Sequence, residues 1–445
     1  MKEFLRSLQA SKSVRTIEEE VSPDLDVSSV LLEFQNVPLL FKHVTGSSFS
    51  VAGNLYSKRS NIENGLGIEP GKLLESLENA SREPASRTGR ITEFDRKDWM
   101  HSGDVDLSRL PILKNFDLEA GRYITAGIVV AKFPGSNEEN LSVHRMLVLS
   151  KNKVAARIVP RHLTQIGKSA EGRIPVSVVI GPPPAVFVSA SLQIQYGLSE
   201  YRVANKLAKG DLQLSTSQNS DISIPVDSEI VLEGFIDFRE LVDEGPFVDL
   251  TGTYDAIRKQ PTITFESAHY KANAVYQTVI ASSLEHSLFM GLPQEIKLRD
   301  ALYKSVPGFR AVNLTAASGG YFHCIVSVDK ASDGDGKTAI INCFAASHPL
   351  KLVIAVDADI DPFDQRQVEW ALATRFQSST GLVTIDGARG SSLDPSSSKV
   401  GVTSKLGLDA TLPMNYDRKK FERARANPSE KSAKIINLLR GEISS

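Results

Sequence analysis

The sequence predicts a mixed α/β (α+β) chain of three domains, and three observations predict this class. The chain has 445 residues, which is more than one ordinary hydrophobic core organises. Its central part is dense in short Val- and Ile-rich segments separated by glycine and proline. After Leu284, apolar strand-like runs alternate with helical spacing. We therefore expect an N-terminal α/β domain over 1–100, a β-rich central domain over 101–290, a C-terminal α/β domain over 291–415 and a helical tail over 416–445.

The N-terminal segment alternates between helical and strand-like patterns. Residues 4–8 carry apolar side chains at helical spacing, and short strand patterns follow over 14–21, 39–41 and 51–55. The composition over 61–98 then becomes polar, charged and helix-compatible, with a connector that contains proline. This change in composition predicts the end of the first domain.

The central segment contains a series of short apolar runs. Strands rich in Val and Ile are expected over 123–130, 146–149, 154–159, 174–180, 185–190 and 230–236. Their close spacing predicts a barrel-like or sandwiched sheet rather than a doubly wound one. Three consecutive prolines at 182–184 cannot lie in a central strand and mark a loop.

The C-terminal segment reads as alternating strands and helices. Continuous apolar runs predict strands buried on both faces over 322–328, 338–344 and 352–356. Residues 365–376 have helical spacing. The last segment, 417–440, is charged and helical and is interrupted by Pro428. We expect it to pack on a neighbouring domain or subunit.

Composition excludes several classes of function. The formal net charge is −2 and no Lys/Arg-rich tract occurs, so a nucleic-acid partner is not expected. The sequence contains no run of eighteen apolar residues, so a membrane helix is not expected. The charged N-terminus lacks an apolar signal core, so secretion is not expected. Cys324 and Cys343 are too few for a disulfide framework and lack metal-site spacing. We expect a cytoplasmic protein with buried free thiols.

The most informative stretch is Glu244–Asp249, which reads Glu-Gly-Pro-Phe-Val-Asp. Gly245 and Pro246 enforce a turn, so the two acids can converge without a helix between them. With Arg145 upstream they offer an acid, a base and a cation, which suits proton transfer on a small substrate. The alternative is an acidic surface loop. Because the apolar middle of the segment around Phe247 should be buried, we favour a functional site.

A second candidate, Asn140–Arg145, reads Asn-Leu-Ser-Val-His-Arg. In a strand, Asn140, Ser142 and His144 share one face, while Arg145 lies on the other face or at a bend. Asparagine and serine with backbone amides suit a phosphate or a hard cation, and arginine suits a carboxylate through two hydrogen bonds. From this motif alone, a polar surface turn before an edge strand is the favoured interpretation.

His162 follows a strand at a loop edge, next to Arg161. As a metal ligand it needs oxygen partners, and Asn140 and Glu200 are of the right type for Mg²⁺ or Mn²⁺. A lone histidine is more often a surface or hydrogen-bonded residue than a ligand. The three residues are far apart in sequence, so spacing alone does not define a metal site.

Lys351 opens the strand expected over 352–356, and three aspartates within 357–361 stand at its far end. The lysine either contacts a phosphate or cofactor, or extends along apolar surface. The aspartates are expected to cap the next helix rather than to bind a cation, because Asp361 and a proline precede a helical pattern. The loop 387–395 is either a lid over a site or an ordinary solvent loop.

Seven motifs, in order along the chain, resemble the UbiD-like family of decarboxylases, which use a prenylated flavin. They are Val51–Leu55, Asp104–Pro111, Asn140–Arg145, Leu198–Tyr201, Glu229–Gly234, Glu244–Asp249 and Ser404–Thr411. Several separate motifs in the right order make the resemblance specific. It implies a central split β-barrel that binds the flavin and a C-terminal α/β domain that takes part in oligomerisation.

The resemblance also implies roles for single residues. Arg145, Glu244 and Asp249 match the family's network of acid, arginine and acid, in which Asp249 would protonate the carbon that loses CO₂. The matched ligands of a Mn²⁺ that grips the flavin phosphate, with K⁺ nearby, are Asn140, His162 and Glu200. The matched flavin contacts are Thr125, Asn140, Ser142, Val143, Arg145, Arg161, His162 and Lys351. Val248 stands where a glycine is usual in the family, so the local turn can differ.

The implied activity is a reversible, non-oxidative decarboxylation through a covalent adduct between the substrate and prenylated FMN. Among aromatic, heteroaromatic and α,β-unsaturated acids, we favour a heteroaromatic acid such as a furan, pyrrole or indole carboxylate. One alternative is phosphorylated anhydromevalonate in an archaeal-type isoprenoid pathway. Others are a catalytically inactive flavin-binding accessory subunit and a metal-dependent hydrolase that uses His162 and Glu200.

The expected partners follow from the same resemblance. A flavin prenyltransferase supplies the cofactor, and a second copy of the chain forms a homodimer or higher homo-oligomer. The substrate is a small carboxylic acid, with CO₂ as the second product. His286, Arg299 and Lys297 could meet a second anionic group of the substrate, with Lys297 favoured as a surface charge.

Overall fold

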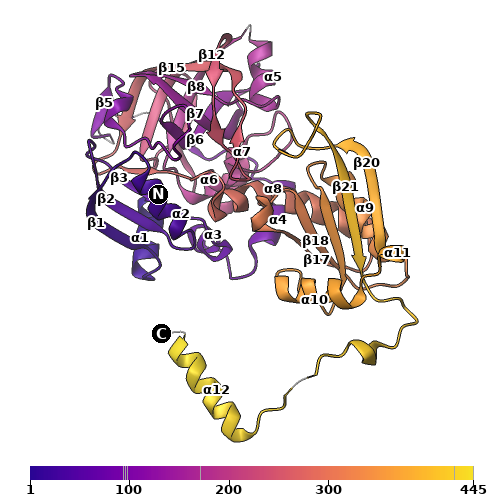
Figure 1. Ribbon diagram of the computed structural model, residues 1–445. Helices are drawn as coiled ribbons and strands as arrows, with labels where there is room; N and C mark the ends of the chain where they lie inside the picture. The colour runs from indigo at the N-terminus through magenta and orange to yellow at the C-terminus, as the bar shows by residue number, and fades with distance from the viewer. Residues whose placement is uncertain (94, 96, 98, 171, 425, 444–445) are drawn as a thin grey trace.

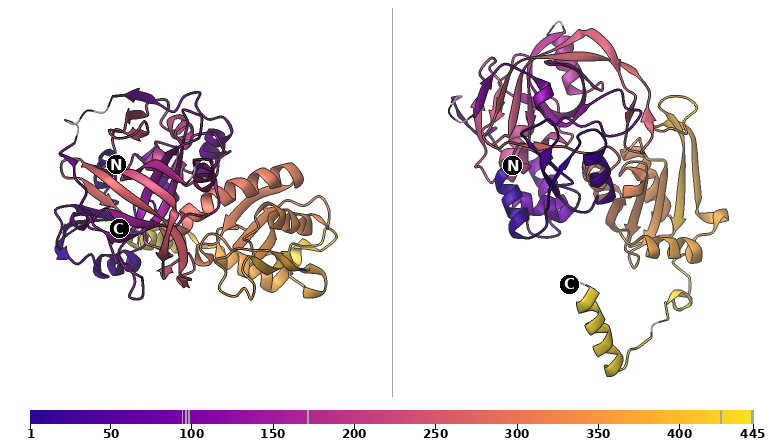
Figure 2. Two further views of the ribbon diagram at one scale, coloured as in Figure 1. Left: turned by 90° about the horizontal axis from the view of Figure 1, so that it is seen from above. Right: turned by 60° about the vertical axis from the view of Figure 1, so that its left-hand side comes forward.

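The computed structural model describes residues 1–443, except for 94, 96, 98, 171 and 425. The elements form two lobes (Figure 1). The N-terminal segment and the central β domain share one lobe, and the C-terminal sheet forms the other, as the view from above in Figure 2 shows. The helix α8 (Leu284–Ser305) leads from the first lobe into the second, where it packs on β17 (Phe309–Leu314) and α9 (Asp335–Ala346).

The N-terminal segment folds into a four-stranded sheet with helices around it. The strand order is β1 (Arg15–Val21), β2 (Leu39–Val44), β3 (Ser50–Gly53) and β16 (Val275–Gln277). The helices are α1 (Lys2–Ala10), α2 (Asp26–Glu33), α3 (Arg59–Leu66) and α4 (Leu73–Arg82). The helix and the strands expected before residue 55 are confirmed. Because β16 comes from the end of the central segment, this sheet joins the two segments into one lobe.

Six strands of the central segment close into a barrel. Around the ring they are β12 (Ile230–Glu244), β9 (Arg173–Ile180), β6 (Tyr123–Lys132), β7 (Glu139–Ser150), β8 (Lys153–Ala156) and β15 (Arg258–Tyr270). β12 also pairs with β15, from Ile230 opposite Tyr270 to Glu244 opposite Arg258, and this pairing closes the ring. The short strand β5 (His101–Gly103) adds to the outer edge of β15. The expected barrel is confirmed.

Helices and small sheets connect the barrel strands. The helices are α5 (His162–Ser169), α6 (Pro184–Ala190) and α7 (Glu200–Leu207). The small sheets are β11 (Ser223–Pro225) with β10 (Gln213–Thr216) and β4 (Arg90–Thr92), and β13 (Phe247–Val248) with β14 (Tyr254–Asp255). The strand expected over 185–190 is wrong, because these residues form α6 and are buried on all sides. A short apolar run has no periodicity that separates a buried helix from a buried strand.

The C-terminal domain is a five-stranded sheet. Its order is β17, β18 (His323–Val328), β19 (Leu352–Asp357), β21 (Val402–Ala410) and β20 (Leu382–Arg389). α8 and α9 pack on one face, and α10 (Gln365–Arg375) contacts the other. The strand expected over 338–344 is wrong, because it lies in α9, whose buried residues Ala339, Ile340, Cys343 and Phe344 form one helical face. Both cysteines are buried and free, as expected.

A short helix, α11 (Ser378–Gly381), precedes β20. After β21 the chain continues through the short helix η4 (Arg418–Phe421) and ends with the helix α12 (Glu430–Ile443). In Figure 1 and in the right view of Figure 2, α12 stands clear of both lobes. Among the described residues, no helix is long and apolar enough to cross a membrane.

Candidate active site

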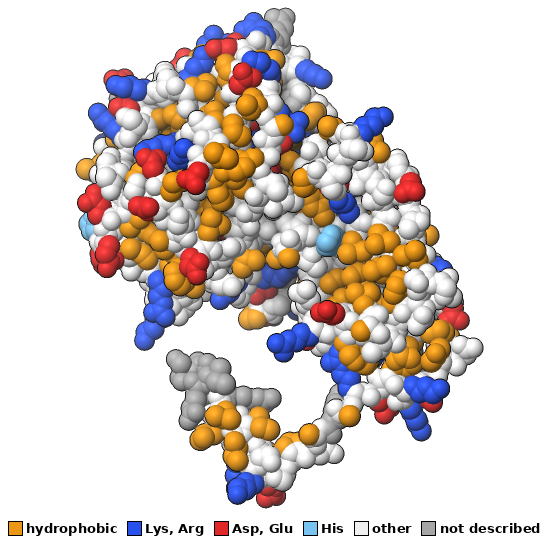
Figure 3. Space-filling model, in the orientation of Figure 1, with side chains coloured by type: hydrophobic (Ala, Val, Ile, Leu, Met, Phe, Trp, Pro, Cys, Tyr) orange, Lys and Arg blue, Asp and Glu red, His pale blue; other side chains and the backbone are white. Residues whose placement is uncertain are grey.

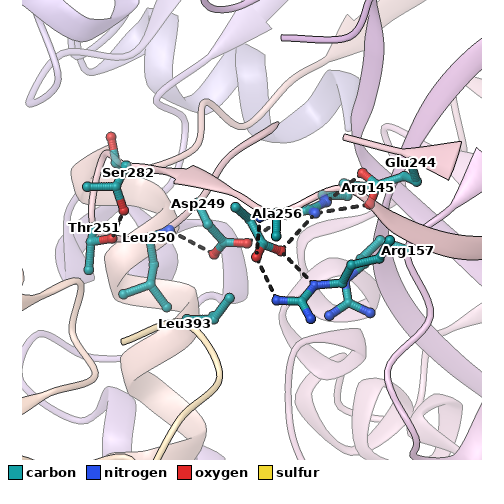
Figure 4. A network of polar contacts seen from close by, with 12 residues as sticks. Arg145, Arg157, Glu244, Asp249, Leu250, Thr251, Ala256, Ser282 and Leu393 are labelled. Carbon is teal, nitrogen blue, oxygen red and sulfur yellow. Dashed lines mark hydrogen bonds and ion pairs between the residues drawn. The ribbon is translucent and has the colours of Figure 1, made fainter. Parts of the chain in front are cut away.

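Arg145 is the centre of a network of acids in the first lobe (Figure 4). Its Nε and Nη2 donate to Glu244 Oε1 and Oε2 at 2.9 and 3.0 Å, a bidentate pair. Its Nη1 donates to Asp249 Oδ2 at 2.7 Å, and Nη2 also donates to Asp255 Oδ2 at 3.2 Å. The structure thus brings together the three residues that the sequence analysis placed in one site.

Each member of the network comes from an element that fixes its position. Glu244 ends the barrel strand β12, and Arg145 lies on β7. Gly245 has a φ of +102°, a value that L side chains rarely adopt, and turns the chain into β13. Phe247 and Val248 of β13 are buried, as expected from the apolar middle of the segment. Asp249 follows β13 directly, and the burial of this strand places its side chain within reach of Arg145.

The charges of the network differ in exposure. The side chain of Glu244 is 0% exposed, that of Arg145 10% and that of Asp249 18%. Burial alone would lower the pKa of Arg145, but hydrogen bonds and charges of Glu244, Asp249 and Asp255 raise it. The second oxygen of Asp249, Oδ1, accepts from the amide of Leu250 at 2.7 Å. Arg145 is therefore permanently cationic, and Asp249 is more exposed than Glu244 among the acids that it binds.

Sequence reasoning missed three charged residues of this site, namely Asp255, Arg258 and Arg157. Asp255 on β14 shares Arg145 and also accepts from Arg258 Nη2 at 2.8 Å. Arg157 lies beside them in Figure 4, and its guanidinium makes no hydrogen bond or ion pair with the residues that the structure describes. Burial, and then the charges of Arg145 and Arg258, lower the pKa of Arg157. None of the three stands in a motif, so only the fold reveals them.

Asn140, Ser142 and His144 share one face of β7, as expected, and are hydrogen-bonded in a row. The favoured interpretation of this motif, a surface turn before an edge strand, is wrong, because β7 lies between β6 and β8 in the barrel and Asn140 is buried. His144 Nδ1 lies 3.0 Å from the carbonyl of Arg157, which can only accept, so Nδ1 carries the proton. Nε2 then accepts from the Ser142 hydroxyl at 2.8 Å, and Ser142 accepts from Asn140 Nδ2 at 3.2 Å. Burial lowers the pKa of His144 to about 4, so the ring is neutral. The side-chain oxygen of Asn140, Oδ1, remains available as a ligand.

The candidate metal ligands fit a divalent cation in chemistry. Glu200 Oε2 accepts from the amide of Leu141 at 2.7 Å, which places this buried carboxylate beside Asn140. Burial raises the pKa of Glu200 to about 8, as for an acid without a cation. His162 begins α5, where burial and then Arg161 lower its pKa and favour the neutral, ligating form. Two oxygen donors and an imidazole suit Mn²⁺.

His162 packs edge-on against the ring of Tyr196, with centroids 5.3 Å apart. In the described part of the chain, no group of three or more His, Cys, Asp and Glu side chains could hold a metal ion. The set with Asn140 contains only two residues of these types, so it stays a prediction.

The other expected flavin contacts lie at different depths. Thr125 on β6 is within 3.1 Å of Thr278 Oγ1 and accepts from the amide of Val279 at 3.3 Å. Val143 is partly buried against a core cluster, and Arg161 is exposed at the start of α5.

Lys351 is engaged by the loop 387–395 and the residue that follows it. Its Nζ donates to Asp394 Oδ1 at 2.9 Å and to Ser396 Oγ at 2.6 Å. Leu393 of the same loop packs on a cluster that includes Leu250, next to Asp249. The loop therefore lies against the site in this conformation, and Lys351 holds it there.

Of the three candidates for a second anionic group, one lies near the network. Burial lowers the pKa of His286. The charge of nearby Asp249 raises this pKa, and that of Arg145 lowers it. His286 Nδ1 accepts from the amide of Ser282 at 3.1 Å, so its Nε2 carries the proton and can act as a donor. Arg299 instead pairs with Glu78, and Lys297 is exposed.

The aspartates after β19 form a different structure from the expected cap. Asp364, not Asp361, caps α10, by accepting from the amides of Arg366 and Gln367. Asp357 and Asp359 both pair with Arg375 of the same helix. The expectation that these three aspartates cap the helix is therefore wrong.

Models of one protein family match almost the whole chain. The matches are the N-terminal domain of 3-octaprenyl-4-hydroxybenzoate carboxy-lyase (UbiD) over residues 5–81, its Rift-related domain over 90–284 and its C-terminal domain over 287–410. The last match begins close to the start of α8, which carries the chain into the second lobe.

Curated relatives and solved structures agree with these matches. The anhydromevalonate phosphate decarboxylase of Methanothermobacter thermautotrophicus is 36% identical over 95% of this chain and 99% of its own, and that of Aeropyrum pernix is 37% identical over 93% and 95%. The UbiD-class enzyme HmfF from Pelotomaculum thermopropionicum, solved in complex with FMN, is 30% identical with a TM-score of 0.92 over 97% of this chain and 98% of that chain.

Proposed function

The chain belongs to the UbiD family of carboxy-lyases, and from this premise we propose that it decarboxylates anhydromevalonate phosphate or a closely similar phosphorylated, α,β-unsaturated acid. The observation that carries the proposal is the similarity to anhydromevalonate phosphate decarboxylases, at 36% and 37% identity over more than nine-tenths of this chain. This similarity favours what was the alternative at the level of sequence over the heteroaromatic acids that we favoured there.

The chemistry assigned to the chain's own residues is proton transfer. Asp249 is the proposed donor of the proton that replaces CO₂ on the substrate carbon. It suits this role because its 18% exposed side chain lies at the open end of the network, with one oxygen on Arg145. Arg145 orients Asp249 and is itself held by the bidentate pair with buried Glu244. A positioned acid of this kind is worth about 10²–10⁴-fold in rate.

The proposed cofactor is prenylated FMN, because an sp² carbon that loses CO₂ needs an electron sink, and this flavin supplies one when bound. Asn140, His162 and Glu200 would hold a Mn²⁺ that binds the flavin phosphate, with K⁺ nearby. The orientation of the Asn140 amide through Ser142 and His144 supports the ligand role of Asn140. Thr125, Val143, Arg161 and Lys351 are the further proposed flavin contacts.

Two groups near the network are proposed to contact the anionic substrate. Arg157 offers a half-buried cation beside Arg145, and His286 offers a neutral donor whose tautomer is fixed by Ser282. A neutral donor binds an anion without adding a charge that would compete with Arg145 for Asp249. A cation and a donor on the same site suit a substrate with both a carboxylate and a phosphate.

We also propose that the protein acts as a homo-oligomer in the cytoplasm and receives its cofactor from a flavin prenyltransferase. Figure 3 shows hydrophobic side chains gathered over the sheet of the second lobe. Leu382 of β20 and Leu406 of β21 share one face of this sheet and are 45% and 38% exposed. A contiguous apolar face of this kind is typical of a protein contact. The proposed domain limits remain 1–100, 101–290, 291–415 and 416–445.

The test is CO₂ release by protein produced with a flavin prenyltransferase. The panel contains anhydromevalonate phosphate, its unphosphorylated acid, and furan, pyrrole and indole carboxylates. We expect kcat/KM for the phosphorylated acid to exceed every other by about 10²-fold or more, because a site built for a phosphate rejects ligands that lack it. Protein produced without the prenyltransferase is the control for cofactor dependence. Highest turnover on a heteroaromatic acid would overturn the substrate proposal.

A further inference from the structure

The hairpin that carries Asp249, residues 246–255, has little rigidity of its own. Its strands β13 and β14 pair through Phe247 with Asp255 and Val248 with Tyr254, and through no further residues of these strands. A two-stranded hairpin of this length is not stable alone in water. Its position, and with it the reach of Asp249, therefore depends on what packs around it.

The turn 115–120, which precedes β6, contacts this hairpin at several points. The amide of Ala120 donates to the carbonyl of Pro246 at 3.0 Å, and the amide of Leu118 donates to Tyr254 Oη at 3.2 Å. The amide of Val248 lies close enough to the carboxylate of Glu119 to favour its charged form. The turn thus holds the hairpin at its first, third and ninth residues.

Glu119 is the centre of the turn. Its side chain is buried, and Oε2 accepts from the amides of Asn115 and Phe116 at 2.9 and 3.3 Å, which shapes the turn. Glu119 Oε1 and Tyr123 Oη are both buried without a hydrogen-bond partner among the described residues. An unpaired buried oxygen costs free energy.

We propose that Glu119 is a positioning residue for proton transfer: through the turn 115–120 it holds the hairpin 246–255 and so sets Asp249 against Arg145 and the substrate carbon. The inference rests on the proposed role of Asp249 as proton donor. The ionisable groups that face Glu119 are Tyr123 and Arg145, and Tyr123 in turn faces Glu244. Burial raises the pKa of Glu119 to about 7, against the opposing effects of its amide donors and of Arg145.

The decisive variant is Glu119→Gln, which keeps the shape of the side chain and removes its charge. Glu63→Gln is the matched control, because Glu63 is also buried and also accepts from two amides, Gly71 at 2.8 Å and Leu73 at 3.3 Å, in the N-terminal domain. The first readout is amide hydrogen exchange of the full chain without flavin. We expect exchange over 246–255 to become about tenfold faster in Glu119→Gln and to stay unchanged in Glu63→Gln.

The second readout is decarboxylation by flavin-loaded protein. We expect kcat of Glu119→Gln to fall about 10- to 100-fold with little change in KM, because a small displacement of a catalytic group is costly. An inflection of kcat near pH 7 in the wild type should be absent from this variant. Tyr254→Phe, which removes one contact of the turn, should lower kcat by a few fold and serves if Glu119→Gln does not fold.

Unchanged exchange over 246–255, or a kcat of Glu119→Gln equal to that of Glu63→Gln, would overturn the inference. Absence of turnover in the wild type would instead refute the proposed function. The exchange experiment, which needs neither flavin nor substrate, would still decide whether Glu119 holds the hairpin.

Discussion

Arg145 and Arg375 are both buried arginines that bridge acids, one in each lobe. Arg375 binds Asp357 at 2.8 Å and Asp359 at 2.7 Å; Asp357 is the last residue of β19, and Asp359 lies two residues later. Asp357 also accepts from the amide of Leu412 at 2.9 Å, so this pair ties α10 to two strand ends. Arg145 instead collects acids from the separate elements β12 and the hairpin 246–255.

The difference between these networks teaches how to recognise a reactive acid. In the Arg375 network, the exposed acid, Asp359, takes a bidentate pair with the arginine and faces solvent. In the Arg145 network the bidentate place belongs to buried Glu244, and Asp249 keeps only one bond to the arginine. An acid held by one bond at the open end of a rigid cation can exchange a proton with a substrate.

The largest expected effect separates the exposed acids of the two networks. Asp249→Asn should lower CO₂ release by about 10³-fold or more, because the proton donor is lost. Flavin content, measured by absorbance, should be unchanged. Asp359→Asn, the matched variant in the other lobe, should change the rate by less than about twofold. Retained turnover with solvent-deuterium incorporation in Asp249→Asn would remove Asp249 from the mechanism.

The next effect separates the two arginines. Arg145→Met should lower kcat/KM by about 10²-fold, because Asp249 loses its orientation. Arg375→Met should lower the free energy of unfolding by about 3 kcal/mol, since Asp357 is left buried without its cation, while kcat of the folded protein stays unchanged. Urea unfolding and steady-state rates of both variants test this. Equal losses of activity in the two variants would contradict the functional difference between the networks.

The smallest effect is a difference in pH dependence. Burial raises the pKa of Asp357, so its contribution to stability is present at low pH and is lost as pH rises through the raised value. Burial also acts to raise the pKa of Asp255, but Arg258 and Arg145 bring it below the ordinary 3.8, so its contribution is present above that pH and is lost in acid.

Unfolding between pH 3 and 6 measures both effects. The stability difference between wild type and Asp255→Asn should shrink toward acid, and that between wild type and Asp357→Asn should shrink toward neutrality. The same slope for both variants would show that the two networks share one electrostatic environment.

The sequence predicted the barrel and much of the site because those features have local signals. The Val- and Ile-rich strands identified β6, β9 and β12, and the hexapeptide around Gly245 identified the turn that brings Glu244 and Asp249 together. The two wrong strands, over 185–190 and 338–344, are short apolar segments whose helical state is set by burial against neighbouring elements.

The missed site residues had no such signal. Asp255 joins Arg145 only because β14 pairs with β13, and Arg157 lies there only because its chain continues from β8 beside β7. Glu119 is one glutamate in an ordinary-looking polar turn, and its burial depends on the hairpin 246–255. Asp255 meets Arg145, and the turn of Glu119 meets the hairpin, across more than a hundred residues of chain, whereas Arg157 depends on the pairing of β8 with β7. No periodicity within one segment encodes such contacts.

Strand β12 closes the barrel along its length and ends at Glu244. Gly234 lies near its start, about 33 Å along the strand from that acid at the usual rise per residue. A Cβ at this glycine would stand 2.0 Å from the carbonyl oxygen of Thr264 on β15, so any larger residue must open the barrel seam. A larger side chain at Gly234 would therefore displace the strand that carries Glu244, although this position touches no member of the Arg145 network.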